Sequence, residues 1–179
     1  INIPSQVIWP VAAGNVSVYG GYEAASDVGL PGNRNTSTWP TVLKSAGYGR
    51  IFRLSYVTNA VLDGLTITGG VTNGSGSNGS GGAIYSESCV NFVVTSCILT
   101  NNRCRDGNGA RGGAFFINNG TVTITNCVIK NNTADGGGGS AGNGGGLYLY
   151  NGSLTLVDSI VAINKAPADV SLTTYGGGI

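Results

Sequence analysis

The stretch Gly81-Gly82-Ala83-Ile84 opens a pattern that repeats through most of the chain. Its first glycine returns as Gly112, Gly145 and Gly177, in steps of 31, 33 and 32 residues. A second element travels with it, as Cys97-Ile98-Leu99-Thr100-Asn101-Asn102, Cys127-Val128-Ile129-Lys130-Asn131-Asn132, Ser159-Ile160-Val161-Ala162-Ile163-Asn164 and, more weakly, Leu65-Thr66-Ile67-Thr68-Gly69-Gly70. A fixed period of this length is typical of solenoid proteins, whose repeats stack on one another.

Alignment of the copies on Asn102, Asn132, Asn164 and Gly70 places apolar residues in register. The three resulting rows are Ala60, Phe92, Val122 and Leu154; Leu62, Val94, Ile124 and Leu156; and Ile67, Leu99, Ile129 and Val161. After the glycine pair, the same alignment matches Ala83 and Tyr85 with Ala114 and Phe116, with Leu147 and Leu149 and, one coil earlier, with Phe52 and Leu54. Polar or small residues separate the apolar ones, which is the period-two pattern of strands.

Three short alternating segments in each repeat predict an all-β fold, a right-handed, single-stranded parallel β-helix with three sheets and about 31–33 residues per coil, Gly-rich loops included. The glycine pair permits positive φ at a corner, and the recurring asparagine is expected near αL or in an amide ladder. We expect residues 15–179 to form the helix. Residues 1–14 are expected to form an extended segment that either caps it or pairs with another subunit.

The extra length of the repeats falls between the asparagine element and the next glycine pair. The four stretches are residues 71–80, 103–111, 133–144 and 165–176, all rich in Gly, Ser, Asn and Asp. Because insertions in a solenoid map to one face, we expect these loops to project from one edge.

The composition favours short strands and tight turns. Glycine accounts for 32 of 179 residues and charged residues for 9%, whereas 41% are hydrophobic, so the chain is not disordered. The net charge of +1 comes without a basic cluster, and no run of about 18 apolar residues occurs, so we expect neither a nucleic-acid partner nor a transmembrane segment. The sequence begins at Ile1 and lacks Met, which favours a processed chain or a piece of a longer one. We expect it to be secreted, either extracellular or on the outer cell surface.

Residues suited to catalysis are sparse. The sequence has no histidine, and Asp63 and Asp158 fall in coils about 14 Å apart along the axis, at ~4.8 Å per coil. We therefore expect no enzyme activity, no catalytic residue and no cofactor. Asp106 and Asp135 lie in successive loops whose oxygen atoms suit Ca²⁺, but the nonapeptide calcium pattern is absent, so we expect ordinary loop residues and no metal.

Cys97 and Cys127 occupy the same position of the repeat, where Leu65 and Ser159 stand in other coils. We expect this position to hold a small side chain that points into the coil. Stacked positions lie ~4.8 Å apart, so two states are open for this pair: a disulfide or two buried free thiols.

Seven Asn-x-Ser/Thr sequences occur in the chain. They begin at Asn15, Asn35, Asn73, Asn78, Asn119, Asn131 and Asn151. Two interpretations stay open, because such asparagines are either surface glycosylation sites or plain turn residues.

The two ends of the predicted helix suggest assembly. Residues 175–179 resemble the opening of another coil, and the first nine residues are apolar and extended by composition. We expect end-to-end self-association or continuation in a longer chain, with a monomeric module that binds a glycan as the alternative. The residues assigned to assembly are Ile1, Ile3, Val7, Trp9, Gly177, Gly178 and Ile179.

The paired motifs resemble the polymorphic outer-membrane protein repeat of bacterial surface autotransporters, Gly-Gly-Ala-(Ile/Leu/Val) followed by Phe-x-x-Asn. Gly81-Gly82-Ala83-Ile84 matches its first half; in the second half Leu99, Ile129 and Val161 replace Phe, while Asn102, Asn132 and Asn164 keep the Asn. The resemblance implies an extracellular structural or adhesive module, either a head-to-tail surface filament or part of a longer passenger. A carbohydrate-binding or polysaccharide-degrading β-helix is the alternative function.

Overall fold

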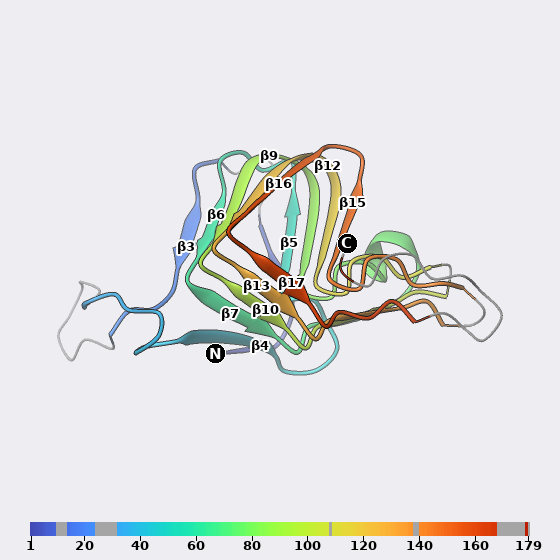
Figure 1. Cartoon of the computed structure of the whole chain (residues 1–179), viewed down its shortest axis with the longest axis horizontal. Coiled ribbons are helices and arrows are strands. Elements are labelled where there is room, and N and C mark those ends of the chain that lie inside the picture. Colours follow the sequence, from blue (N-terminus) through green and yellow to red (C-terminus); the bar gives the residue numbers. More distant parts are fainter. Residues whose placement is uncertain (10–13, 24–31, 108, 138–139, 168–177, 179) are drawn as a thin grey trace.

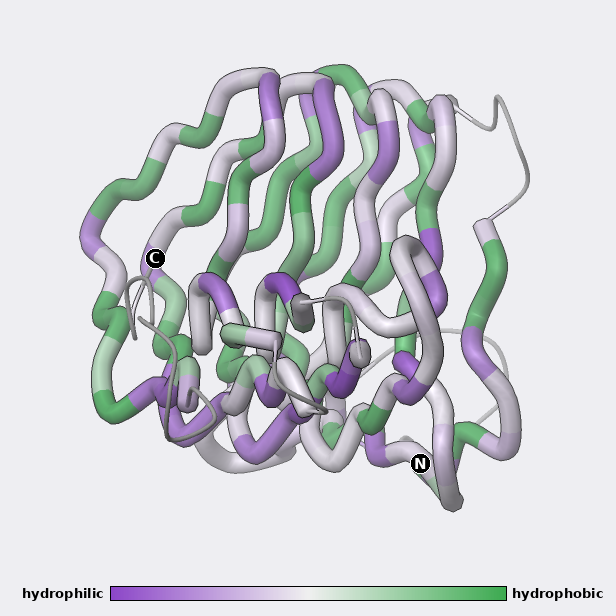
Figure 2. The backbone as a smooth tube through the Cα atoms, turned by 90° about the vertical axis from the view of Figure 1, so that its right-hand side faces the viewer, coloured by the Kyte–Doolittle hydropathy of each residue, from purple (hydrophilic) through white to green (hydrophobic). Residues whose placement is uncertain are grey.

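A computed structural model describes residues 1–9, 14–23, 32–107, 109–137, 140–167 and 178. The structure is a parallel β-solenoid of about three turns, with 53% of residues in strands and almost no helix. Viewed down the solenoid axis, the chain runs upward along β5 (Phe52–Ser55), crosses the apex and runs downward along β6 (Val61–Asp63) (Figure 1). It then returns along β7 (Leu65–Thr68), and each further coil lies closer to the viewer. The coils then follow one another along the axis (Figure 2). This sense is right-handed, as predicted, and as expected for parallel crossovers.

The first sheet forms the base of the coil and is called the base sheet. Its strands are all parallel, and each comes from a different coil. In spatial order they are β1 (Asn2–Ile3), β4 (Thr41–Ser45), β7 (Leu65–Thr68), β10 (Ile98–Thr100), β13 (Val128–Lys130) and β17 (Ile160–Ala162).

The second sheet bends over the apex and forms the other two sides, so it is called the curved sheet (Figure 1). Its longest strands, β9 (Ile84–Thr95) and β12 (Phe115–Thr125), run through the bend. Before the bend β9 pairs with β5 (Phe52–Ser55), which in turn pairs with β2 (Val7–Ile8), and β12 pairs with β15 (Leu147–Tyr150). After the bend β9 pairs with β6 (Val61–Asp63), which continues to β3 (Ser17–Tyr19), and β12 pairs with β16 (Ser153–Val157).

The third sheet lies in the loops that project from one edge, as predicted (Figure 1). These loops are not irregular throughout, because their first residues pair as β8 (Val71–Asn73), β11 (Arg103–Arg105) and β14 (Thr133–Asp135). One 3₁₀ turn, η1 (Gly76–Asn78), follows β8. We call this sheet with its loops the arm. Of the fourth predicted loop, residues 168–176 lie outside the described residues.

The predicted apolar rows form the core. Phe92, Val94, Val122 and Ile124 are buried, and β9 and β12 hold them in the predicted register. The members of the same rows in the last coil, Leu154, Leu156 and Val161, are only partly buried, because no further coil covers them among the described residues.

The alignment of the glycine segment is wrong by one residue in two copies: Phe52 pairs with Ile84, not with Ala83, and Leu147 belongs to the same row. Leu147 pairs with Phe115, which pairs with Ile84, so Leu147 does not align with Ala83 and Ala114. Three glycines in a row precede Leu147, and the position of the glycine pair in this copy is therefore ambiguous. The inward row is therefore Phe52, Ile84, Phe115 and Leu147, and Tyr85, Phe116 and Tyr148 point outward. A one-residue slip moves a strand's side chains to the opposite face of the sheet.

Two neighbouring asparagines follow the base strands β10 and β13: the first forms the turn, and the second points its side chain into the coil. Asn101 and Asn131 adopt the left-handed conformation, with φ of 54° and 56°, and are exposed. The next residue in each coil points its side chain inward. In the last coil Ile163 occupies the left-handed position with φ of 56°, which is unfavourable for a β-branched residue.

The N-terminal segment belongs to the coil. β1 pairs with β4, β2 pairs with β5, and Trp9 is buried against Phe52, with their ring centroids 6.3 Å apart. Of the two roles expected for this segment, the structure shows the cap: residues 1–9 cover the apolar ladder of their own first coil. Pairing with another subunit stays a prediction.

Candidate functional site

The candidate functional site suggested by the sequence consists of the two end coils. Gly178 accepts a hydrogen bond from the Leu147 N–H at 3.0 Å, as Gly146 does from Phe115 and Ala114 does from Ile84. The backbone at Gly178 therefore continues the curved sheet in register. Gly177 and Ile179, also assigned to assembly, lie outside the described residues.

The same apolar ladder reaches both ends of the described helix. The pairing of β1 with β4 aligns Ile1 with Leu43, and successive base strands continue this row to Val161. Ile1 is largely exposed and Ile3 partly buried, while Val7 on β2 is exposed. Among the described residues, no strand pairs with the outer edges of β1, β2 and β3 at one end or of β16 and β17 at the other. The two ends therefore expose strand edges of the same orientation and the two ends of one ladder.

A buried amide ladder stiffens the coils between these ends. The Asn102 N–H and Nδ2 both donate to Oδ1 of Asn132, at 2.9 and 3.0 Å. The Asn132 N–H and Nδ2 donate in the same way to Oδ1 of Asn164, both at 3.0 Å. Asn102 and Asn132 are almost fully buried, so the ladder predicted from the repeat is an internal feature of the fold.

The cysteine pair is inward, but no disulfide joins it. Cys97 and Cys127 are each 1% exposed, both thiols are free, and the Cys97 N–H donates to Sγ of Cys127 at 3.4 Å. The hydrogen bond between the two side chains raises the pKa of the Cys97 thiol, and burial raises it further. The same hydrogen bond lowers the pKa of the Cys127 thiol, against the opposite effect of burial. Of the two states left open by the sequence, the structure contains the free thiols.

All seven asparagines of the Asn-x-Ser/Thr sequences are exposed. Four of them, Asn15, Asn119, Asn131 and Asn151, have positive φ, and Asn35 accepts hydrogen bonds from the Ser37 and Thr38 N–H groups at its own turn. These five asparagines therefore adopt turn conformations, whereas Asn73 ends β8 and Asn78 ends η1. Glycosylation of the seven sites stays a prediction.

The carboxylates considered for chemistry are held apart. Asp63 pairs with Arg34 at 2.6 Å, whereas Asp158 is exposed at a turn three coils away, where the residue aligned with Asp63 is Val157. Asp106 accepts a hydrogen bond from the Gly76 N–H at 2.8 Å, and Asp135 pairs with Arg103 and Arg105. Among the described residues, no group of three or more Cys, Asp or Glu side chains is placed to hold a metal ion.

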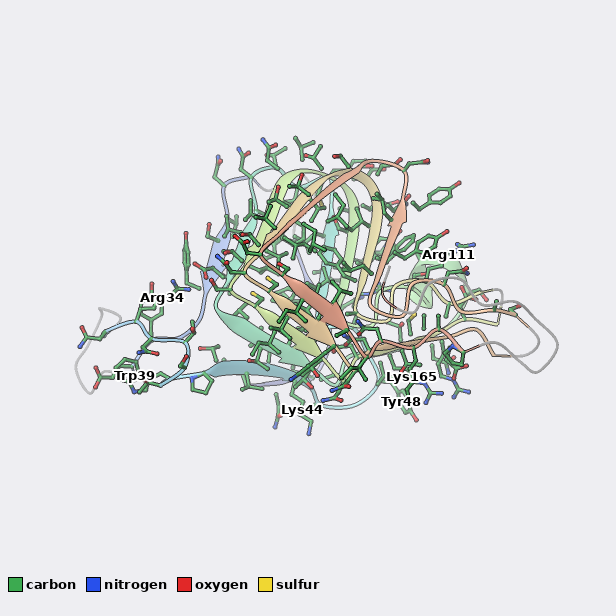
Figure 3. The ribbon with its side chains drawn as sticks, in the orientation of Figure 1. Arg34, Trp39, Lys44, Tyr48, Arg111 and Lys165 are labelled. Atoms are coloured by element: carbon green, nitrogen blue, oxygen red, sulfur yellow. The ribbon has the colours of Figure 1, made fainter. Side chains whose placement is uncertain are left out.

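A column of outward-facing aromatic rings lies where the arm meets the coil. The alignment of the glycine segment matches Tyr85 with Phe116 correctly but misses the third ring, Tyr148. The ring of Phe116 lies 5.3 Å from that of Tyr85 and 5.7 Å from that of Tyr148. Arg111 lies over Tyr148, and Figure 3 places this arginine at the root of the arm. Tyr85 and Phe116 are buried, so the column packs the arm against the coil and does not offer free rings.

Comparisons of the chain with protein-family models, with curated proteins and with solved structures find no match. In the described part of the chain, no helix has the length and apolar character needed to cross a membrane.

Proposed function

We propose that this chain is an extracellular structural or adhesive β-helix module, which extends by stacking the open end of one copy on that of the next. The observation that carries this proposal is the pair of open ends described above. One ladder runs from Ile1 to Val161, and the hydrogen-bonding pattern of the curved sheet continues at Gly178. Open strand edges with exposed apolar ladders favour strand addition.

The direction of the strands supports a head-to-tail contact. Every strand-to-strand pairing between coils is parallel, so a copy added at β15–β17 meets the next copy at its β1–β3 end. Such a contact uses two different surfaces and does not close on itself, so it generates a filament. The resemblance to the autotransporter repeat supports the same class of function, and a secreted location at the outer cell surface is part of this proposal. The wide spacing of Asp63 and Asp158 supports a function without hydrolase or lyase activity.

A matched pair of substitutions tests the proposal. Val161→Lys places an ammonium group on the open end of the inward row, whereas Ile160→Lys places one on the exposed outer face of the same strand. We expect the unaltered chain and Ile160→Lys to form concentration-dependent oligomers in sedimentation velocity, and Val161→Lys to remain a monomer. Monomers in all three samples, or equal association of the two variants, would contradict the stacking proposal.

A further inference from the structure

A pocket of about 350 Å³ lies near the N-terminal end, away from the apolar ladder. Three separate segments form it: the turn between β1 and β2, the turn that follows β4, and the start of the arm at β8 and η1. The antiparallel bridge between Gly49 and Val71 closes one wall, with hydrogen bonds of 2.7 and 3.0 Å. This volume is within the range of small-molecule sites.

Arg50 supplies a buried positive charge to this pocket. It is 4% exposed, and its Nε and Nη2 donate only to backbone carbonyls, those of Ser77, Asn78, Ser80 and Gly81. No ion pair with Arg50 occurs among the described residues, and the pocket lining contains no Asp or Glu. Burial, followed by the nearby charge of Arg53, lowers the pKa of Arg50 to about 10. A buried guanidinium without a counter-ion favours an anionic ligand.

Thr72 supplies a second, independent observation. The residue is 5% exposed, and its Oγ1 is buried without a hydrogen-bond partner in the described part of the structure. Its arm neighbours in register are Cys104 and Ala134, so the position needs only a small apolar side chain. A buried hydroxyl without a partner is costly, and a ligand in the pocket that this residue lines would satisfy it.

The rest of the lining fits a sugar. Ser5, Gln6 and Asn78 offer neutral hydroxyl and amide groups, and Tyr48 stands at the rim with 86% of its surface exposed. Figure 3 places Tyr48 at the base of the arm, on the outside of the coil. An open aromatic ring beside neutral donors and acceptors suits the apolar face and the hydroxyls of a saccharide. The guanidinium adds a preference for a carboxylate.

We propose that this pocket binds a carboxylate-bearing sugar residue, with its carboxylate toward Arg50 and its ring against Tyr48. Such a site would give a surface module a ligand among acidic polysaccharides. The inference does not depend on end-to-end stacking, because the pocket is complete within one copy.

Calorimetric titration of the whole chain tests the site with three probes: methyl glucuronide, methyl glucoside and inorganic phosphate. We expect the glucuronide to bind at least about ten-fold more tightly than the glucoside, the difference made by one charged hydrogen bond. Inorganic phosphate should bind more weakly than methyl glucuronide and should not displace the glucuronide from the pocket. Thr72→Val should weaken binding about ten-fold while leaving the unfolding midpoint unchanged or higher, since it removes an unsatisfied hydroxyl.

Tyr48→Ala should weaken glucuronide binding several-fold, whereas Tyr56→Ala, an exposed tyrosine at the apex, is the matched control and should bind normally. Arg50→Gln should abolish the preference for the glucuronide over the glucoside. If this variant unfolds, the affinities of Thr72→Val and Tyr48→Ala for the glucuronide still test the site. The proposal is overturned if the folded chain does not bind the glucuronide, binds the glucoside or phosphate equally well, or loses no affinity in Thr72→Val and Tyr48→Ala.

Discussion

Replacement of Asn132 by alanine should be among the most damaging single changes in the chain. Its side chain is fully buried and makes four hydrogen bonds, including those that Oδ1 accepts from the N–H and Nδ2 of Asn102. Alanine leaves the buried Asn102 N–H without an acceptor, which costs about 1–3 kcal/mol, and removes contacts worth about 1 kcal/mol more. We therefore expect the free energy of unfolding to fall by about 3 kcal/mol.

Urea unfolding followed by circular dichroism measures this difference directly. The matched control is Asn131→Gly, one residue earlier, because Asn131 is exposed and glycine accepts its φ of 56°. The control should change stability by less than about 0.5 kcal/mol. A loss below about 1 kcal/mol in Asn132→Ala, or equal losses in both variants, would refute the structural role of the ladder.

Three further substitutions test other parts of the fold by the same unfolding assay. Ile124→Ala, which empties a fully buried site between Val94 and Leu156, should cost about 2–5 kcal/mol; a smaller loss would contradict the row alignment. Ile163→Asn should stabilise the chain by about 1 kcal/mol, because asparagine tolerates the left-handed conformation that strains isoleucine; destabilisation would disprove that explanation. Burial raises the pKa of the Cys104 thiol from 9.0 to about 12, so unfolding releases a proton above pH 9 and stability should fall by up to about 1.4 kcal/mol per pH unit toward pH 12. Cys104→Ala should show a shallower fall over that window, and an unchanged slope would contradict the assignment.

The base rows could be predicted from sequence because their signal is local and repeated. Ile67, Leu99, Ile129 and Val161 each precede the reference position by three residues, and the strands pair them accordingly. The glycine segment is misaligned at Leu147, because glycine carries no side chain to mark the register and three stand together before that residue. It is also misaligned at Phe52, because no glycine pair precedes that residue.

The pocket could not be predicted because nothing in the repeat marks it. Arg50 precedes the first full copy of the glycine motif, and Thr72 stands where later coils have Cys104 and Ala134. Their proximity depends on the turn after β4 reaching β8, a contact between segments of unrelated sequence. The N-terminal strands were missed for a similar reason, since two-residue strands carry no period.

Electron microscopy of the purified, unaltered chain tests the central claim most directly. If the open ends stack, the images should show filaments one coil-diameter wide, with the ~4.8 Å strand spacing continuing along the filament axis through every subunit junction. Isolated particles at all concentrations, or copies joined side by side with their axes offset, would contradict the account.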